Sequence, residues 1–217
     1  DAENLMVDFK QLYTELLNQL TLNHLSVNEL TAKKLVEYLL LLHKWNQIHN
    51  LTSIRNPINM VSRHIIDSLT IAPYLQGPHL IDIGTGAGLP GIPLALTQPQ
   101  YHFVLLDSNG KKTRFLTHVL QTLAISNAEV IASRVEKYQP TVCFNSLVSR
   151  AFSHLNDFLI KTKHLCCEKG IFLAMKGQYP GEEIKQLDSQ FKLIETKSLQ
   201  IAGLDEKRHL LIIGLNR

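Results

Sequence analysis

The residues best suited to chemistry lie in one short stretch, where a carboxylate is followed by closely spaced glycines. Asp82 precedes Gly86, Gly88 and Gly91, whose spacing is G-x-G-x-x-G. Glycines at this spacing let the backbone turn tightly and approach a ligand. Asp107 follows about 20 residues later, where nucleotide-binding folds place a carboxylate on the ribose hydroxyls. The pattern predicts a nucleotide-type cofactor, although Asp107 could instead cap the next helix.

Two cofactors suit such a loop, NAD and S-adenosylmethionine. Asp82 would repel a pyrophosphate, whereas it could order the loop around a methyl donor. Leu89 and Pro90 stand where a helix N-terminus would otherwise offer free amides to phosphate. These features favour S-adenosylmethionine, and an NAD-linked oxidoreductase is the alternative. The residues expected to hold the donor are Gly84, Gly86 and Leu89 at its methionine and sugar parts, and Asp107 at its ribose hydroxyls.

Short apolar strands must bring these residues to one edge of a sheet. From residue 79 onward, apolar runs alternate with helical patterns, which indicates a doubly wound α/β sheet. The parallel strands are predicted at 79–84, 101–107, 128–132, 146–149 and 170–176. The last two strands, 191–201 and 208–215, have no helix between them and must pair antiparallel. The prediction is a Rossmann-like sheet of seven strands, five of them parallel and closed by a C-terminal antiparallel hairpin, as in class I S-adenosylmethionine-dependent methyltransferases.

The beginning of the chain contains helical patterns and no strand. Apolar residues recur at helical spacing in three segments, the second expected to be capped by Ser26 and the third opened by Asn56 and Pro57. We expect an N-terminal helical extension over residues 1–75 that recognises substrate or acts as a lid. Its simplest alternative role is to cover apolar surface. Residues 76–217 would then form the methyltransferase domain.

Composition narrows the class of protein. The chain has 217 residues and is 45% hydrophobic, enough for one sizeable core. It contains no apolar run of membrane-spanning length and no basic-then-apolar signal pattern, so we expect a cytoplasmic protein. A net charge of +3 permits an RNA partner without indicating one. Cys143, Cys166 and Cys167 lack C-x-x-C spacing, which predicts reduced thiols and no metal site. The chain begins at Asp1, and Met6 is a candidate for the native start.

An ordered series of short motifs runs from about Leu42 to Leu211. The motifs are Trp45-Asn46, Asn50 to Ser53, Arg63 to Ile65, Asp67-Ser68, Asp82 to Pro93, Leu105 to Ser108, Lys111-Lys112, Arg114 to Leu116, Ser133 to Glu136, Ser149 to Phe152, Lys176-Gly177 and Arg208 to Leu210. Together they resemble the RsmG family, also called GidB, of bacterial small-subunit rRNA guanine-N7 methyltransferases. Ala87 departs from the proline that relatives often have, and Asn109 is a variable position. The resemblance implies transfer of a methyl group from S-adenosylmethionine to N7 of a guanine in the 530 loop of 16S rRNA.

Further site residues follow from this resemblance. Val135 would offer an apolar side to the adenine ring, and the Glu136 carboxylate or a backbone amide would meet its polar edge. Arg150 would face the donor carboxylate or the target base, unless it forms an ion pair with Asp82 or Asp157. Guanine N7 carries an in-plane lone pair and no hydrogen, so the reaction requires no general base and we assign no catalytic residue; Arg150 is the candidate for positioning.

Basic residues near the predicted strand ends are candidates for RNA contacts, because phosphates require Lys or Arg near the cofactor mouth. The candidates are Arg63, Lys111, Lys112, Arg114, Arg134, Lys176 and Arg208. The expected partner is 16S rRNA or the small ribosomal subunit, and we expect a monomer. Besides the methyltransferase and the oxidoreductase, a third hypothesis is an inactive methyltransferase-like ribosome assembly factor.

Overall fold

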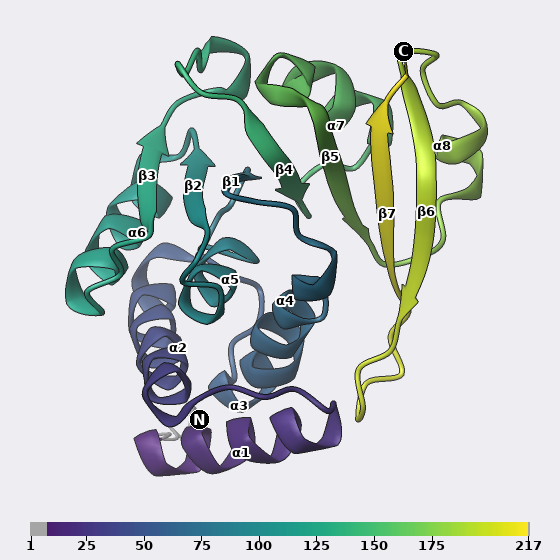
Figure 1. Ribbon diagram of the computed structural model, residues 1–217. Helices are drawn as coiled ribbons and strands as arrows, with labels where there is room; N and C mark the ends of the chain where they lie inside the picture. Colours follow the sequence, from purple (N-terminus) through teal and green to yellow (C-terminus); the bar gives the residue numbers. More distant parts are fainter. Residues whose placement is uncertain (1–7, 217) are drawn as a thin grey trace.

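The computed structural model describes residues 8–216 and shows a central sheet with helices on both faces (Figure 1). The strands are β1 His79–Ile83, β2 His102–Asp107, β3 Ala128–Ala132, β4 Phe144–Ser149, β5 Cys166–Lys176, β6 Phe191–Leu199 and β7 Arg208–Leu215. Their order is β3-β2-β1-β4-β5-β7-β6. Strands β1 to β5 pair in parallel, and β7 is antiparallel to both β5 and β6. The predicted α/β sheet and its closing hairpin are confirmed, whereas Met6 lies outside the described residues.

Successive side chains along each strand point to opposite faces of the sheet, so the core has two layers. Leu80 and Phe103 face one cluster of buried side chains, whereas Ile81 and Val104 face the other. The first layer is covered by α1 Phe9–Leu22, α2 Glu29–His49, α3 Pro57–Met60, α4 Asp67–Leu69, α5 Gly91–Thr97 and α6 Gly110–Thr122. The second is covered by α7 Leu155–Thr162 and α8 Gly181–Lys185. None of the helices in residues 8–216 is long and apolar enough to cross a membrane.

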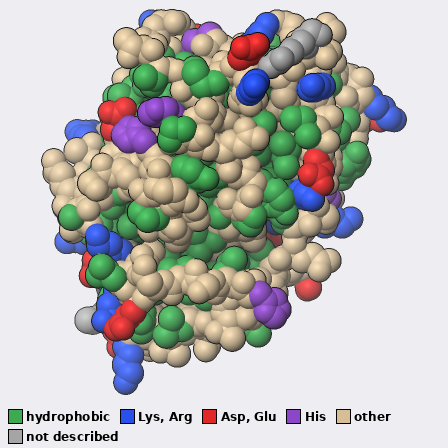
Figure 2. Space-filling view, viewed as in Figure 1, with side chains coloured by type: hydrophobic (Ala, Val, Ile, Leu, Met, Phe, Trp, Pro, Cys, Tyr) green, Lys and Arg blue, Asp and Glu red, His purple; other side chains and the backbone are tan. Residues whose placement is uncertain are grey.

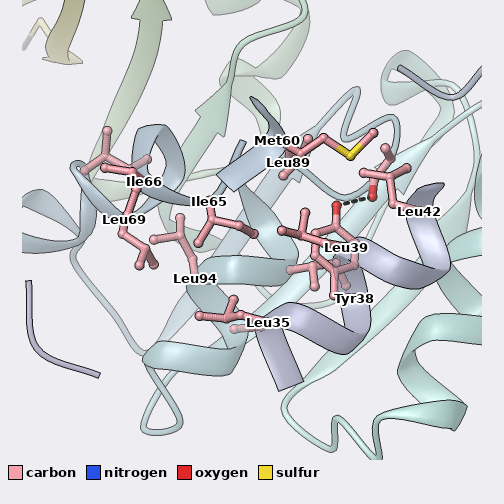
Figure 3. Close-up of a cluster of buried hydrophobic side chains, with 14 of the residues drawn as sticks. Leu35, Tyr38, Leu39, Leu42, Met60, Ile65, Ile66, Leu69, Leu89 and Leu94 are labelled. Atoms are coloured by element: carbon pink, nitrogen blue, oxygen red, sulfur yellow. Dashed lines mark hydrogen bonds between the residues drawn. The ribbon is translucent and has the colours of Figure 1, made fainter. Parts of the chain in front are cut away.

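The N-terminal helices share the first layer with the sheet, as Figure 3 shows for side chains of α2 beside those of the glycine loop and α5. Tyr38 on α2 is buried, and its hydroxyl donates to the carbonyl of Ala87 over 2.6 Å. The glycine loop therefore rests directly on α2. Two details of α2 differ from the prediction. Asn28 rather than Ser26 caps the helix, because the Asn28 side chain accepts the Thr31 amide. Leu30, which follows the helical spacing of apolar residues expected to face the core, is 68% exposed.

The segment between α2 and the sheet contains an irregular helix. Asn56 caps α3 and Pro57 occupies its first turn, as predicted. The helix then widens into a π-helix, η1 Val61–Ile66, before α4 begins at Asp67. Ile65 and Ile66 are fully buried in the first layer, and Asp67 is 5% exposed. Single π-helical turns are frequent at functional sites, so the position of Asp67 directly after one is notable.

The prediction of three reduced cysteines was wrong. Cys143 and Cys167 are joined by a disulfide, with sulfur atoms 1.99 Å apart. Parallel pairing of β4 with β5 places Phe144 opposite Cys166, which brings the two residues together across 24 positions of sequence. Cys166 is a free thiol whose burial raises its pKa to about 12.

The remaining short helices are 3₁₀ turns: η2 Ala72–Tyr74, η3 Val135–Lys137 and η4 Lys163–Leu165. Of these, η3 follows β3 directly and carries two of the predicted site residues to the carboxyl edge of the sheet. In open α/β sheets ligands bind beyond this edge, so the loops after β1, β2, β3 and β4 outline the candidate site.

Candidate functional site

Asp82 anchors the glycine loop from within β1. One carboxylate oxygen, Oδ2, accepts the Thr85 hydroxyl over 2.7 Å and the Gly91 amide over 2.8 Å, so it joins both ends of the loop. The other oxygen, Oδ1, is buried and has no hydrogen-bond partner among the described residues. Burial raises the pKa of Asp82 to about 7, and the two hydrogen bonds oppose the rise. The expectation that this carboxylate orders the loop agrees with the geometry.

Glycine is required at two positions of the loop for different physical reasons. Gly86 has a φ of +60°, and a side chain there would meet nothing within 4 Å, so the backbone conformation alone favours glycine. At Gly91 a Cβ would collide with the Leu105 side chain and lie 2.8 Å from Asp82 Oδ2. Only glycine lets the start of α5 approach the carboxylate this closely.

The N-terminus of α5 has few amides left for a ligand. The Gly91 amide donates to Asp82, and the Ile92 amide donates to the Gly88 carbonyl over 2.7 Å. Pro93 has no amide hydrogen, and the Leu94 amide donates to the Pro90 carbonyl over 3.1 Å. A dinucleotide pyrophosphate is normally held by free amides at this position. The arrangement therefore suits a cofactor without phosphates.

Asp107 ends β2 and crosses to the glycine loop. Its Oδ2 accepts the Gly86 amide and its Oδ1 accepts the Asn109 amide, each over 2.9 Å. The cap of α6 is Asn109, whose side chain accepts the amides of the first turn, so Asp107 is not the helix cap. Each carboxylate oxygen can accept a second hydrogen bond. Asp107 thus retains acceptor capacity for a pair of hydroxyls.

A cavity of about 250 Å³ opens beside Asp107 at the carboxyl ends of β1, β2 and β3. We call it the donor cavity. The predicted site residues that line it are Gly84, Asp107, Arg134, Val135 and Glu136, and Phe152 joins them from the loop after β4. Val135 is buried and Glu136 is exposed, so the cavity has an apolar side and a polar rim. This combination suits an adenosine, with its flat ring and its two ribose hydroxyls.

Three residues predicted to bind the methyl donor do not line the donor cavity. Gly86 does not line the donor cavity, but its amide holds Asp107 in place. Leu89 is 5% exposed and packs in the first core layer, so its side chain supports the loop from below. Arg150 does not line the donor cavity but a second hollow of about 150 Å³.

Arg150 belongs to a chain of ion pairs that begins in this second hollow. Its Nη1 lies 3.4 Å from Asp67 Oδ2, and Arg208 Nε lies 2.8 Å from Asp67 Oδ1. Glu206 then links Arg208 to Arg63, at 3.0 and 2.7 Å. Burial raises the pKa of Asp67, and the two arginines oppose the rise. The ion-pair partner of Arg150 is therefore Asp67, not Asp82 or Asp157 as the sequence alternatives had it.

The predicted RNA-binding residues separate into two groups. Arg63 and Arg208 are paired through Glu206, and Lys176 pairs with Glu183 at 3.1 Å. The other group forms no ion pairs among the described residues and consists of Lys111, Lys112, Arg114 and Arg134. Arg134 lines the donor cavity, Lys111 and Lys112 lie in the first turn of α6, shortly after the cavity residue Ser108, and Arg114 lines a separate hollow. On the face shown in Figure 2, Lys and Arg side chains lie in small groups toward the outline and form no single large patch. The free group is the better candidate for phosphate contacts.

Asp67 and Phe152 line the second hollow and the donor cavity, and the sequence prediction gave neither of them a role. Both stand in the quoted motifs, but neither a buried acid on a helix nor a lone phenylalanine indicated which way it would point. Two histidines lie near these residues without a predicted role. His64 is buried, and its Nε2 lies 2.8 Å from the Thr52 hydroxyl. The ring of His209 lines the second hollow, and its Nδ1 donates to the Gly177 carbonyl over 2.7 Å.

Comparison with solved structures supports the fold. The chain superposes on the glycopeptide N-methyltransferase MtfA complexed with S-adenosyl-L-methionine with a TM-score of 0.61, at 9% identity, over 71% of this chain and 88% of that one. The ribosomal protein L11 methylase from Lactobacillus delbrueckii subsp. bulgaricus gives a TM-score of 0.52 at 13% identity, over 70% and 77% of the two chains. These likenesses establish the methyltransferase fold.

Sequence comparison is more specific. The chain is 48% identical over 189 residues to the ribosomal RNA small subunit methyltransferase G of Psychromonas ingrahamii, covering 87% of this chain and 91% of the relative. It is 46% identical over 193 residues to the protein of the same name from Escherichia coli O1:K1 / APEC, covering 89% and 93%. The family model for GidB, rRNA small subunit methyltransferase G, matches residues 31–211. The chain belongs to the GidB family of rRNA small subunit methyltransferases.

Proposed function

We propose that this protein transfers the methyl group of S-adenosylmethionine to N7 of a guanine in the 530 loop of 16S rRNA. The observation that carries the proposal is the donor cavity, where the Asp107 carboxylate meets an apolar wall at the edge of a methyltransferase sheet. Membership in the GidB family supports the RNA substrate. The protein would act in the cytoplasm as a monomer, on 16S rRNA or on the small ribosomal subunit.

Within the donor cavity, the residues have separate tasks. Asp107 would accept the ribose hydroxyls through the acceptor sites that Gly86 and Asn109 leave open. Val135 would pack on the adenine ring, with the Glu136 carboxylate or a backbone amide at its polar edge. Gly84 has a φ of +67° and brings bare backbone to the cavity, where the sugar and methionine parts would pass. Leu89 would act through packing beneath the loop.

S-adenosylmethionine supplies an electrophilic methyl group on a sulfonium. Guanine N7 has no proton to lose, so the protein needs no general base and must instead align the base with the methyl group. Phe152 lines the donor cavity and Arg150 lines the second hollow, and both stand in the loop after β4. They are therefore the residues placed to orient the base. The product ring is cationic, and the ionised Asp67 behind Arg150 moderates the positive field at that point.

The free basic group would hold the RNA backbone. Lys111 and Lys112 lie in the first turn of α6, shortly after Ser108 of the donor cavity, and Arg134 lines the cavity itself. Positive charges at this position would fix the register of the RNA through its phosphates, without reading its sequence. The helical extension of residues 1–75, which carries Asp67, would complete the recognition surface.

Two experiments test the proposal against its alternatives. Calorimetry should detect S-adenosylhomocysteine binding and no NADH binding, since α5 has no free first-turn amides for a pyrophosphate. Transfer of a labelled methyl group should then be measured on free 16S rRNA, 30S subunits and 70S ribosomes, with the modified position mapped. Binding without transfer to any of the three would support the inactive assembly factor instead.

A further inference from the structure

The hollow that contains Arg150 keeps hydrogen-bonding groups that its ion pairs do not occupy. It measures about 150 Å³ and is lined by Asp67, Arg150, Met175, Lys176, Arg208 and His209, among others. It adjoins the donor cavity, because Lys176, which lines the hollow, donates to the carbonyl of Phe152, which lines the donor cavity, over 3.3 Å. A group bound in this hollow would lie next to a ligand in the donor cavity. We call this space the arginine hollow.

The hydrogen-bonding capacity left in the arginine hollow is uneven. Arg208 is largely occupied, with Nε on Asp67, Nη2 on Glu206 and Nη1 on the Lys207 carbonyl. Arg150 makes one side-chain hydrogen bond among the described residues, a long one of 3.4 Å to Asp67. A guanidinium has five N–H donors, so most of those on Arg150 stay available.

Asp67 has acceptor capacity to match. Each of its oxygens receives one guanidinium nitrogen, at 2.8 and 3.4 Å, and each can accept a second bond. The π-helix before Asp67 widens the turn that leads into it, and the residue lies at the wall of the arginine hollow although it is 95% buried. The hollow thus presents a hydrogen-bond donor and an acceptor from two different elements, the loop after β4 and helix α4.

We propose that the arginine hollow binds the target guanine by its Watson–Crick edge, with Arg150 donating to O6 and Asp67 accepting from N1–H and the N2 amino group. This inference rests on the proposed function. Guanine offers one acceptor beside two donors along that edge, and adenine lacks both O6 and the N2 amino group. Binding by this edge leaves N7 uncovered on the adjacent side of the ring. Asp67 would then determine specificity and Arg150 would position the base.

The test combines a change in the protein with a change in the base. Inosine lacks the N2 amino group of guanosine and keeps O6, N1–H and N7. Small-subunit RNA carrying either guanosine or inosine at the target position is methylated by the wild type, Asp67→Ala and Asp67→Asn. In the wild type, inosine should lower kcat/KM by about 10- to 150-fold, as expected for loss of a hydrogen bond to a charged acceptor. In Asp67→Ala the two RNAs should differ by less than about 3-fold, with Asp67→Asn in between.

Several outcomes decide the matter. Equal kcat/KM for the two RNAs in the wild type would overturn the guanine assignment, and so would an undiminished inosine effect in either variant. Asp67→Asn is isosteric and keeps the test available if Asp67→Ala does not fold. No methyl transfer to the guanosine RNA by the wild type would count against the proposed function itself. Glu129→Gln is the matched control and should keep the full inosine effect. It removes an exposed carboxylate of edge strand β3, which lies 3.6 Å from His102 of β2. Affinity for S-adenosylhomocysteine should be the same in all variants.

Discussion

Replacing Asp82 with asparagine should change how the free energy of unfolding depends on pH. Relative to the wild type, the variant should become more stable as the pH rises. The pKa of this carboxyl is raised from 3.8 to about 7, chiefly by burial. A carboxyl with a raised pKa stabilises the fold when protonated, so stability decreases as the pH rises from the unfolded value toward 7. Each pKa unit corresponds to about 1.4 kcal/mol, which gives a full penalty of about 4 kcal/mol. About 3 kcal/mol of it should develop between pH 5 and pH 8.

The asparagine variant is informative because it fits the observed hydrogen bonds. Thr85 and Gly91 both donate to Oδ2, so the amide oxygen can take that place, and the amide nitrogen replaces the oxygen that has no partner. The unpartnered nitrogen costs about 1–3 kcal/mol, but this cost is the same at every pH. Only the pH-dependent part of the difference reports on the carboxylate.

Urea denaturation of both proteins at several pH values measures this difference. The urea midpoint of the variant minus that of the wild type should increase by about 1 M from pH 5 to pH 8. His64 titrates in the same range with the opposite sign, because burial lowers its pKa to about 4 and protonation in acid favours unfolding. That contribution is common to both proteins and cancels in the comparison. Midpoints that differ by a constant amount at every pH would refute the reasoning about Asp82.

Three further outcomes are expected. Asp107→Asn should weaken S-adenosylhomocysteine binding by about 10- to 150-fold in calorimetry, since a charged acceptor for the ribose is lost; unchanged affinity would remove Asp107 from the donor site. Gly91→Ala should destabilise the protein by about 1–3 kcal/mol in urea denaturation, because the new Cβ meets Leu105 and Asp82; a stability equal to that of the wild type would contradict the close packing at this glycine. Replacing both Lys111 and Lys112 with alanine should lower the slope of log affinity for RNA against log salt by about 1.4, with donor affinity unchanged. A loss of donor affinity would instead place these lysines at the cofactor.

The sequence predicted the sheet well because each strand carries a strong local signal. The bounds of β3 and β7 agree with the prediction, and the other strands differ by a few residues at one end. The absence of a helix between the last two strands was enough to require the antiparallel hairpin, since a short connection cannot join parallel neighbours. The cap of α2 was predicted less well. Ser26 and Asn28 are both good capping residues, and where α2 packs determines which of them begins the helix.

The sequence alone predicted the glycine loop and placed Asp82 and Asp107 beside it, because these residues are close along the chain or separated by one strand and one helix. Tertiary structure decided which distant charges meet. Asp67, Arg150 and Arg208 come from α4, the loop after β4 and the start of β7, and no local pattern indicates that they share one hollow. For the same reason only the fold could separate the paired basic residues from Lys111, Lys112, Arg114 and Arg134. The sequence shows which side chains are charged, but packing across the sheet determines which of them form ion pairs.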